Sequence, residues 1–277
     1  MNLMIIKNIL ISTAAFISSA CTQNSTQNFS GGRTNVADTA ATEKSQPFQM
    51  GNVINNAFSL APLQNKIRRA DTAQTLINVL HIGDSHIKSG FYSEPFMQKL
   101  NQYYMQRYGG KLFFNFQWFC KIGTKYSDYN DLAELDNQLV SSQFDLVIIS
   151  LGTNDAFSGS SRVNFYEKID HLVKKIQMLA PKVSILITTP PDALKMNPAR
   201  RSYAPLPELI NVVNTIVNYC ITNKIAFWNL HQIMGGTYSI NRWIMEKKAA
   251  PDRVHFTAAG YGQFADWLYE AFTKTIN

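Results

Sequence analysis

Short apolar segments alternate with longer amphipathic segments from residue 77 onward, and this alternation limits the possible folds more than any other feature of the sequence. Five apolar segments have the length and composition of buried strands, at residues 77–82, 113–119, 146–150, 183–188 and 225–228. Helical spacing of apolar residues occupies residues 60–69, 93–108, 131–140, 163–179, 206–222 and 258–273. Strands that alternate with helices favour a parallel sheet covered on both faces. We therefore predict an α/β fold, a three-layer α/β/α sandwich around a five-stranded, mostly parallel sheet.

The first 21 residues have the form of a secretory signal. Lys7 precedes an uncharged apolar run, and small residues stand directly before Cys21. This ending resembles a bacterial lipobox, in which the cysteine is lipidated and becomes the mature N-terminus. We expect an exported lipoprotein of the periplasm or cell envelope, held to a membrane by a lipid on Cys21; plain secretion and a retained anchor are the alternatives.

Residues 22–56 are rich in Ser, Thr, Asn, Gln and Ala, and they show no sustained apolar period. Such a segment cannot bury enough surface to fold alone, so we predict a flexible tether. Residues 57–277 are long enough for one α/β domain with a sizeable core.

The formal net charge is +7, but the basic residues are scattered through the folded segment apart from short pairs. A nucleic-acid-binding protein would present a basic face with interleaved aromatic residues, so we expect no nucleic-acid partner. Attraction to an anionic envelope polymer is compatible with this charge. Cys120 and Cys220 both have apolar neighbours, which is more typical of separate core residues than of a disulfide, and their pairing stays open.

A serine directly follows the first predicted strand, in the sequence Gly83-Asp84-Ser85-His86. Open α/β sheets place their ligands at the carboxyl ends of strands, where a serine can act as a nucleophile. The same serine can instead cap a helix, and four letters alone do not decide between the two roles. Catalysis requires a base and a pocket that stabilises an anion.

Asp252 and His255 supply the base and the group that orients it. A carboxylate three residues before a histidine can reach its Nδ1 atom and leave Nε2 free to take the proton of Ser85. The oxyanion then needs fixed donors, for which Asn154 and Gly123 are the candidates, together with the N–H of Ser85. Asn154 follows the third predicted strand and Gly123 follows the second, so both belong to the same edge of the sheet.

Three other residues are candidates for the substrate pocket because they lie in turns after strand ends: His86, Tyr126 and Phe157. For His86, packing inside the fold is an equal alternative. His171 and His231 lack partners at metal-ligand spacing, and we expect neither a metal nor a cofactor.

Four segments together resemble the SGNH hydrolases, also called GDSL-type esterases. They are Gly83-Asp84-Ser85, the lone Gly123, the segment 152–155 and the segment 252–255. The resemblance implies an SGNH-hydrolase-like, flavodoxin-like fold, a triad of Ser85, His255 and Asp252, and oxyanion donors at Gly123 and Asn154. His86 departs from the leucine of the GDSL name. The string His-Ile-Gly-Asp-Ser-His-Ile looks more like the branch that includes peptidoglycan O-acetylesterases.

We therefore expect a serine esterase that removes a small acyl group, acetyl first, from a cell-envelope or other carbohydrate. Three alternatives remain: a lipase or thioesterase for longer acyl chains, an acyltransferase with the same triad, and a non-catalytic envelope-binding lipoprotein. The natural substrate and the oligomeric state are not determined by the sequence.

Overall fold

Five parallel strands form the central sheet of the computed structural model, which describes residues 51–159 and 164–276. The strands are β1 (Thr75–Gly83), β2 (Leu112–Cys120), β3 (Leu146–Ser150), β4 (Ser184–Thr188) and β7 (Ala226–Trp228). They are ordered β2-β1-β3-β4-β7, and every neighbouring pair runs parallel. The predicted α/β fold with a five-stranded sheet is confirmed.

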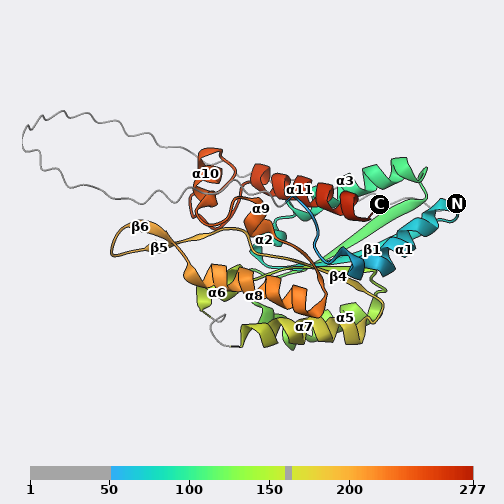
Figure 1. The fold of residues 1–277 in the computed structure, drawn as a ribbon, viewed down its shortest axis with the longest axis horizontal. Coiled ribbons are helices and arrows are strands. Elements are labelled where there is room, and N and C mark those ends of the chain that lie inside the picture. The colour runs from blue at the N-terminus through green and yellow to red at the C-terminus, as the bar shows by residue number, and fades with distance from the viewer. Residues whose placement is uncertain (1–50, 160–163, 277) are drawn as a thin grey trace, which may run out of the picture. The chain divides into compact units, whose positions relative to one another are not determined.

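Helices cover both faces of the sheet (Figure 1). One face carries α1 (Ala61–Arg68), α3 (Ser93–Arg107) and α11 (Ala258–Ile276). The other carries α5 (Ala133–Ser141), α7 (Phe165–Leu179) and α8 (Pro207–Asn223). Each face has its own hydrophobic core, and alternate residues of β1 serve the two: Ile77 and Val79 enter the first core, Leu80 and Ile82 the second.

The strand order places a reversal at β1. The chain moves from β1 outward to β2, then returns to the other side of β1 for β3 and continues in that direction. Right-handed crossovers then put the helix between β1 and β2 on one face and the later ones on the opposite face. In sheets with this order the ligand crevice lies outside the carboxyl ends of the strands at the reversal, here β1 and β3.

Several short elements join the main ones. They are the 3-10 turns η1 (Ala57–Leu60) and η2 (Arg69–Asp71), the helices α2 (Ser85–Lys88), α4 (Tyr126–Asn130), α6 (Thr153–Ser158), α9 (Leu230–Ile233) and α10 (Ser239–Met245), and the strands β5 (Leu194–Asn197) and β6 (Ser202–Pro205). β5 and β6 pair antiparallel as a separate two-stranded sheet. None of these elements was predicted, because the helices are too short to show a helical period and the two strands carry no apolar alternation.

The folded chain begins before residue 57, which corrects the predicted end of the tether. Ile54 is buried, Asn55 pairs with Phe227 of β7, and the Asn52 side chain accepts a hydrogen bond of 2.8 Å from the Trp228 indole. The predicted signal, Cys21 and tether residues 22–50 lie outside the described residues. Among the helices that are described, none has both the length and the hydropathy needed to span a bilayer.

Cys120 and Cys220 are both free thiols. Cys120 packs against the first core and Cys220 lies in the second, so the sheet separates them. The two cysteines are therefore separate thiols, which is the alternative that their apolar neighbours favoured.

Candidate active site

Ser85 is held at the carboxyl end of β1 by the start of a short helix. Asp84 caps α2, and its Oδ1 atom accepts a hydrogen bond of 3.0 Å from the N–H of His86. Gly83 permits the close turn, since a Cβ there would lie 2.1 Å from Cγ1 of Ile87. Ser85, the first residue of α2, is half-buried. Backbone packing thus fixes where Ser85 stands at the end of β1.

Ser85, His255 and Asp252 form one hydrogen-bonded chain. Ser85 Oγ lies 3.0 Å from His255 Nε2, and His255 Nδ1 lies 2.7 Å from Asp252 Oδ2. A carboxylate can only accept, so Nδ1 carries the proton and Nε2 is free to accept from the Ser85 hydroxyl. This is the geometry that a serine nucleophile and its base require.

The Asp252 carboxylate remains ionised through its local contacts. Partial burial opposes its charge, but hydrogen bonds from the His255 ring and from two backbone N–H groups outweigh burial and hold the pKa of Asp252 below its ordinary value. Those N–H groups belong to Val254 and His255, at 2.9 and 3.0 Å from Oδ1.

Arg253, between the acid and the base, anchors this loop to the rest of the domain. Its backbone is in the left-handed region, with φ of 59°, and its carbonyl accepts from the N–H of Leu194 at 2.9 Å. The guanidinium lies 4.5 Å from the centre of the Tyr203 ring and donates to Oδ1 of Asn241. The loop therefore rests on hairpin β5–β6 and on α10.

The site is open to solvent on the side of the base. The His255 side chain is 42% exposed and that of Asp252 is 50% exposed. A large substrate can therefore approach the triad from outside the fold.

Asn154 connects the ends of three strands. Its side-chain Nδ2 donates to Asp84 Oδ2 at 3.0 Å and to the Thr124 carbonyl at 3.1 Å. Gly123, next to Thr124, is exposed and has a φ of 77°, and a Cβ there would meet no atom within 4 Å. Glycine at this position serves its left-handed backbone and not a lack of space. The segments containing Ser85, Gly123 and Asn154 thus converge after β1, β2 and β3.

Residues 79–268 match the profile of the family described as GDSL-like Lipase/Acylhydrolase. The chain belongs to this family. It is accordingly an ester hydrolase, and the resemblance inferred from the four sequence segments is confirmed. No curated protein sequence matches the chain.

Solved structures of esterases share the fold. A peptidoglycan O-acetylesterase superposes with a TM-score of 0.70 at 16% identity, over 82% of this chain and 98% of that one. A two-domain esterase active on acetylated mannans gives 0.59 at 18% identity, over 82% of this chain and 57% of that one. An acetyl xylan esterase gives 0.55 at 20% identity, over 70% of this chain and 99% of that one. At these identities the likeness shows the fold alone.

In this GDSL-family chain His86 lies behind the triad. Its Nδ1 is 3.0 Å from the Tyr261 hydroxyl, its Nε2 is 3.3 Å from Thr153 Oγ1, and its ring centre is 5.4 Å from that of His255. Burial, followed by the neighbouring His255, lowers the pKa of His86 to about 3. The ring is therefore neutral and engaged on both nitrogens, which is the packing alternative considered for this residue.

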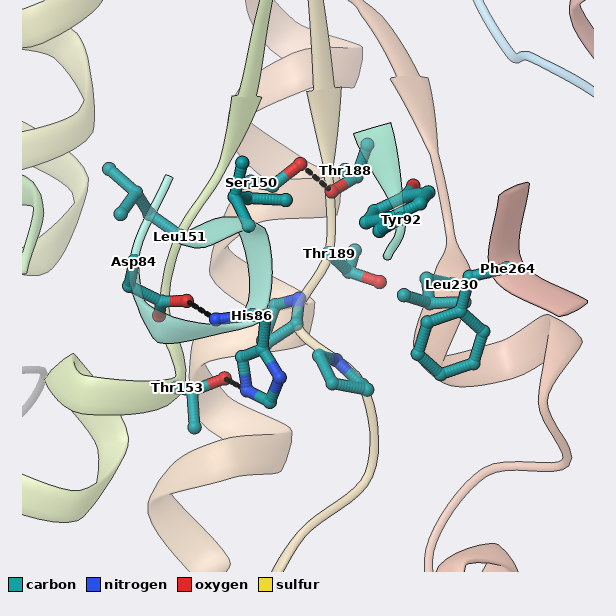
Figure 2. A pocket seen from close by; sticks show the side chains of 13 residues that line it. Asp84, His86, Tyr92, Ser150, Leu151, Thr153, Thr188, Thr189, Leu230 and Phe264 are labelled. Carbon is teal, nitrogen blue, oxygen red and sulfur yellow. Dashed lines mark hydrogen bonds between the residues drawn. The ribbon is translucent and has the colours of Figure 1, made fainter. Parts of the chain in front are cut away.

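The space beside His86 is small. A cavity of about 20 Å³, room for roughly one water molecule, lies between it and the first core. Figure 2 shows Tyr92, Leu230 and Phe264 on the side of this cavity away from Asp84. An acyl chain has no room in it.

The prediction that Tyr126 lines the substrate pocket is wrong. Its ring has no exposed surface and packs edge-on against Phe165, with the ring centres 5.5 Å apart, because α4 turns this side chain into the second core. Phe157 is half-buried and also packs against the second core.

Two contributions to the site were not predicted. Asp84 was treated only as part of the serine motif, yet it orients both Asn154 and α2. Tyr129 donates from its hydroxyl to the Gly83 carbonyl at 2.6 Å and so supports the strand end below Ser85. The position of Asp84 directly before the serine was the available signal for the first, and the position of Tyr129 in the loop after the second predicted strand was the signal for the second. The described residues contain no cluster of three or more His, Cys, Asp or Glu side chains suited to a metal ion.

Proposed function

We propose that this protein is an exported serine esterase that removes small acyl groups, acetyl first, from a cell-envelope or other carbohydrate. The hydrogen-bonded chain from Ser85 through His255 to Asp252 is the observation that carries the proposal. Ser85 Oγ attacks the ester carbonyl while His255 Nε2 takes its proton. His255 then returns that proton to the leaving alcohol, and water releases the acid by the same route.

Asp252 holds His255 in the required tautomer and stabilises the imidazolium that forms. The oxyanion would be met by the N–H groups of Ser85 and Gly123 and by the Asn154 amide. Both Asn154 hydrogens are engaged in this structure, with Asp84 and Thr124. Binding of an oxyanion would draw one of them away from the Thr124 carbonyl, the uncharged and therefore weaker acceptor.

Two features support a small acyl group on a large carrier. The exposed imidazole of His255 and the exposed carboxylate of Asp252 allow a bulky alcohol to lie across the site. Structures of the same fold, moreover, include a peptidoglycan O-acetylesterase and esterases of acetylated mannan and xylan.

Export and anchoring through Cys21 complete the proposal. The leader at residues 1–21 would bring the enzyme to the compartment that holds envelope glycans. Replacement of Cys21 by Ala should move the protein from the membrane fraction to the soluble exported fraction and abolish its labelling by radioactive palmitate. Unchanged fractionation and labelling would contradict the lipid anchor.

The purified protein and its Ser85→Ala variant test the activity directly. Wild type should release acetate from O-acetylated peptidoglycan or another acetylated glycan and should prefer 4-nitrophenyl acetate to the palmitate ester, whereas Ser85→Ala should do neither. Preference for palmitate would instead indicate a lipase. Transfer of acetate to added sugar in place of water would indicate a transferase, and equal activity of the two proteins would reject the triad.

A further inference from the structure

The hairpin β5–β6 projects from the domain beside the catalytic loop. It follows β4 in the chain, and Figure 1 shows it extending beyond the helices that cover the sheet. Its strands have four residues each, so its tip lies roughly 13 Å from its base. An isolated two-stranded sheet is marginally stable in water, so the base of this one needs anchoring.

The anchor is the loop that carries the triad. Leu194, at the base of β5, is buried, and its N–H donates to the Arg253 carbonyl at 2.9 Å. Tyr203 of β6 lies under the Arg253 guanidinium. Arg253 stands between Asp252 and His255 in the chain, so the position of the hairpin is fixed relative to the catalytic base.

The exposed part of the hairpin is positively charged. Lys195, Arg200 and Arg201 are all exposed, and residues 193–207 contain no Asp or Glu. Asp192, which precedes this segment, is buried, and its Oδ2 accepts from the N–H of Ile240 at 3.0 Å. No acidic side chain of the hairpin itself therefore neutralises its three cations.

We propose that hairpin β5–β6 is a docking arm for an acidic polysaccharide, whose carboxylates contact Lys195, Arg200 and Arg201 while an ester of the same chain reaches Ser85. This inference rests on the proposed esterase function and specifies its substrate as a carboxylate-bearing, O-acylated glycan. Arginine pairs with carboxylates through two parallel N–H···O bonds, and a polymer with repeated carboxylates can engage several cations at once. The open face at His255 and Asp252 lets such a chain continue past the triad.

Charged residues also protect exposed strands from pairing with other chains, which is the simpler explanation of these cations. A protective role predicts aggregation when the charges are removed, with no effect on the substrate. A docking role predicts weaker binding of acidic glycans alone. The two explanations therefore differ in measurable ways.

Binding is tested in a Ser85→Ala background, so that the result does not depend on catalysis. The full chain carrying Lys195→Gln, Arg200→Gln and Arg201→Gln is compared with a control carrying Arg69→Gln, Lys182→Gln and Lys274→Gln, which removes the same charge from exposed positions outside the hairpin. Polygalacturonate should bind the control but bind the hairpin variant about tenfold more weakly, with the difference lost in high salt. Neutral mannan should not distinguish the two.

Kinetics with Ser85 intact provide the second readout. On acetylated pectin the hairpin variant should show a KM about tenfold higher at unchanged kcat, because binding remote from the reacting bond stabilises ground and transition states equally. On 4-nitrophenyl acetate and on acetylated glucomannan it should match the control. Circular dichroism and light scattering should show both variants folded and monodisperse to the same degree as wild type.

Equal binding and equal KM for the two variants on acidic glycans would overturn the docking arm and leave the esterase function intact. Loss of binding to phosphatidylglycerol vesicles without loss of binding to polygalacturonate would also overturn it, in favour of a membrane contact. Failure of wild type to hydrolyse any ester would reject the proposed function, while the binding comparison would still report on the hairpin.

Discussion

The Asn154 amide donates a hydrogen bond of 3.0 Å to the Asp84 carboxylate and so ties the end of β3 to the residue that precedes Ser85. Asp84 is almost fully buried, and burial raises its pKa to about 6 although its hydrogen bonds act in the opposite direction. Near pH 7 it is thus mainly a carboxylate, which is a stronger acceptor than a neutral oxygen. The orientation of Asn154 is therefore set by Asp84.

Asp84→Asn should lower kcat by about 10-fold because an amide in this position accepts more weakly and turns a donor group toward neighbouring donors. Asn154→Ala should lower kcat by roughly 10²- to 10³-fold through loss of an oxyanion donor. Hydrolysis of 4-nitrophenyl acetate by wild type and the two variants measures both effects.

The double variant shows whether Asp84 acts through Asn154. In the Asn154→Ala background, Asp84→Asn should cause little further loss, since the amide that it orients is absent. Multiplication of the two single losses would show that Asp84 acts independently. Thermal unfolding of each variant separates these effects from loss of the fold.

Asp252→Asn tests the acid of the triad. An amide at this position would favour the wrong tautomer of His255, so kcat should fall by roughly 10²- to 10⁴-fold. Asp266→Asn is the matched control, because Asp266 is similarly exposed and pairs with Lys99 on the surface at 3.0 Å. A loss below threefold for Asp252→Asn would show that His255 needs no partner at Nδ1.

Gly83→Ala tests the close contact below the nucleophile. The added Cβ would meet Ile87 Cγ1 at 2.1 Å, so α2 and Ser85 must shift and both Tm and kcat should fall. Gly262→Ala, in α11 with no atom within 4 Å of the new Cβ, should instead keep kcat and stabilise by up to about 1 kcal/mol. Adding Ile87→Ala to Gly83→Ala should restore part of the activity. Without recovery, the loss of activity in Gly83→Ala would not be due to the contact with Ile87.

The sequence predicted those parts of the fold that depend on a repeated pattern. The boundaries of β3 agree with the prediction at both ends, because a short apolar run that is buried on two faces is typical of a central parallel strand. Hairpin β5–β6 was missed, since its exposed residues carry no apolar alternation. The start of the packed chain was misplaced because Asn52 and Asn55 are held by hydrogen bonds to distant residues, and such contacts leave no signature in composition.

In the site, the contacts of Ser85 with His255 and of His255 with Asp252 followed from motif order and strand ends. The inward direction of Tyr126 and His86 did not follow. Each lies in a helix of only four or five residues, and the face that such a helix presents to the core depends on packing with distant elements. Tyr261, the partner of His86, is 175 residues away in the chain.

We expect the buried histidines to dominate the response of this fold to acid. Burial lowers the pKa of His81 and of His86 to about 3 and that of His231 to about 4. Each takes up its proton in the unfolded chain near pH 6.5 and in the folded chain only at much lower pH, so stability is lost as the pH falls through this window. Asp84 and Asp192 act in the opposite direction below pH 6, because burial raises the pKa of each to about 6.

The pKa shifts of the three histidines are larger than those of the two aspartates, so the folded state should lose stability overall as the pH falls from 7 to 4.5. In a domain of this size each kcal/mol lost lowers Tm by about 2–4 °C, and Tm should therefore fall by several degrees. His231→Gln removes one titrating group and should narrow the difference in Tm between the two pH values. His171→Gln, at an exposed position of α7, should leave the difference unchanged. Differential scanning calorimetry measures all three proteins. An equal pH response of wild type and His231→Gln would show that the buried His231 does not contribute to acid unfolding.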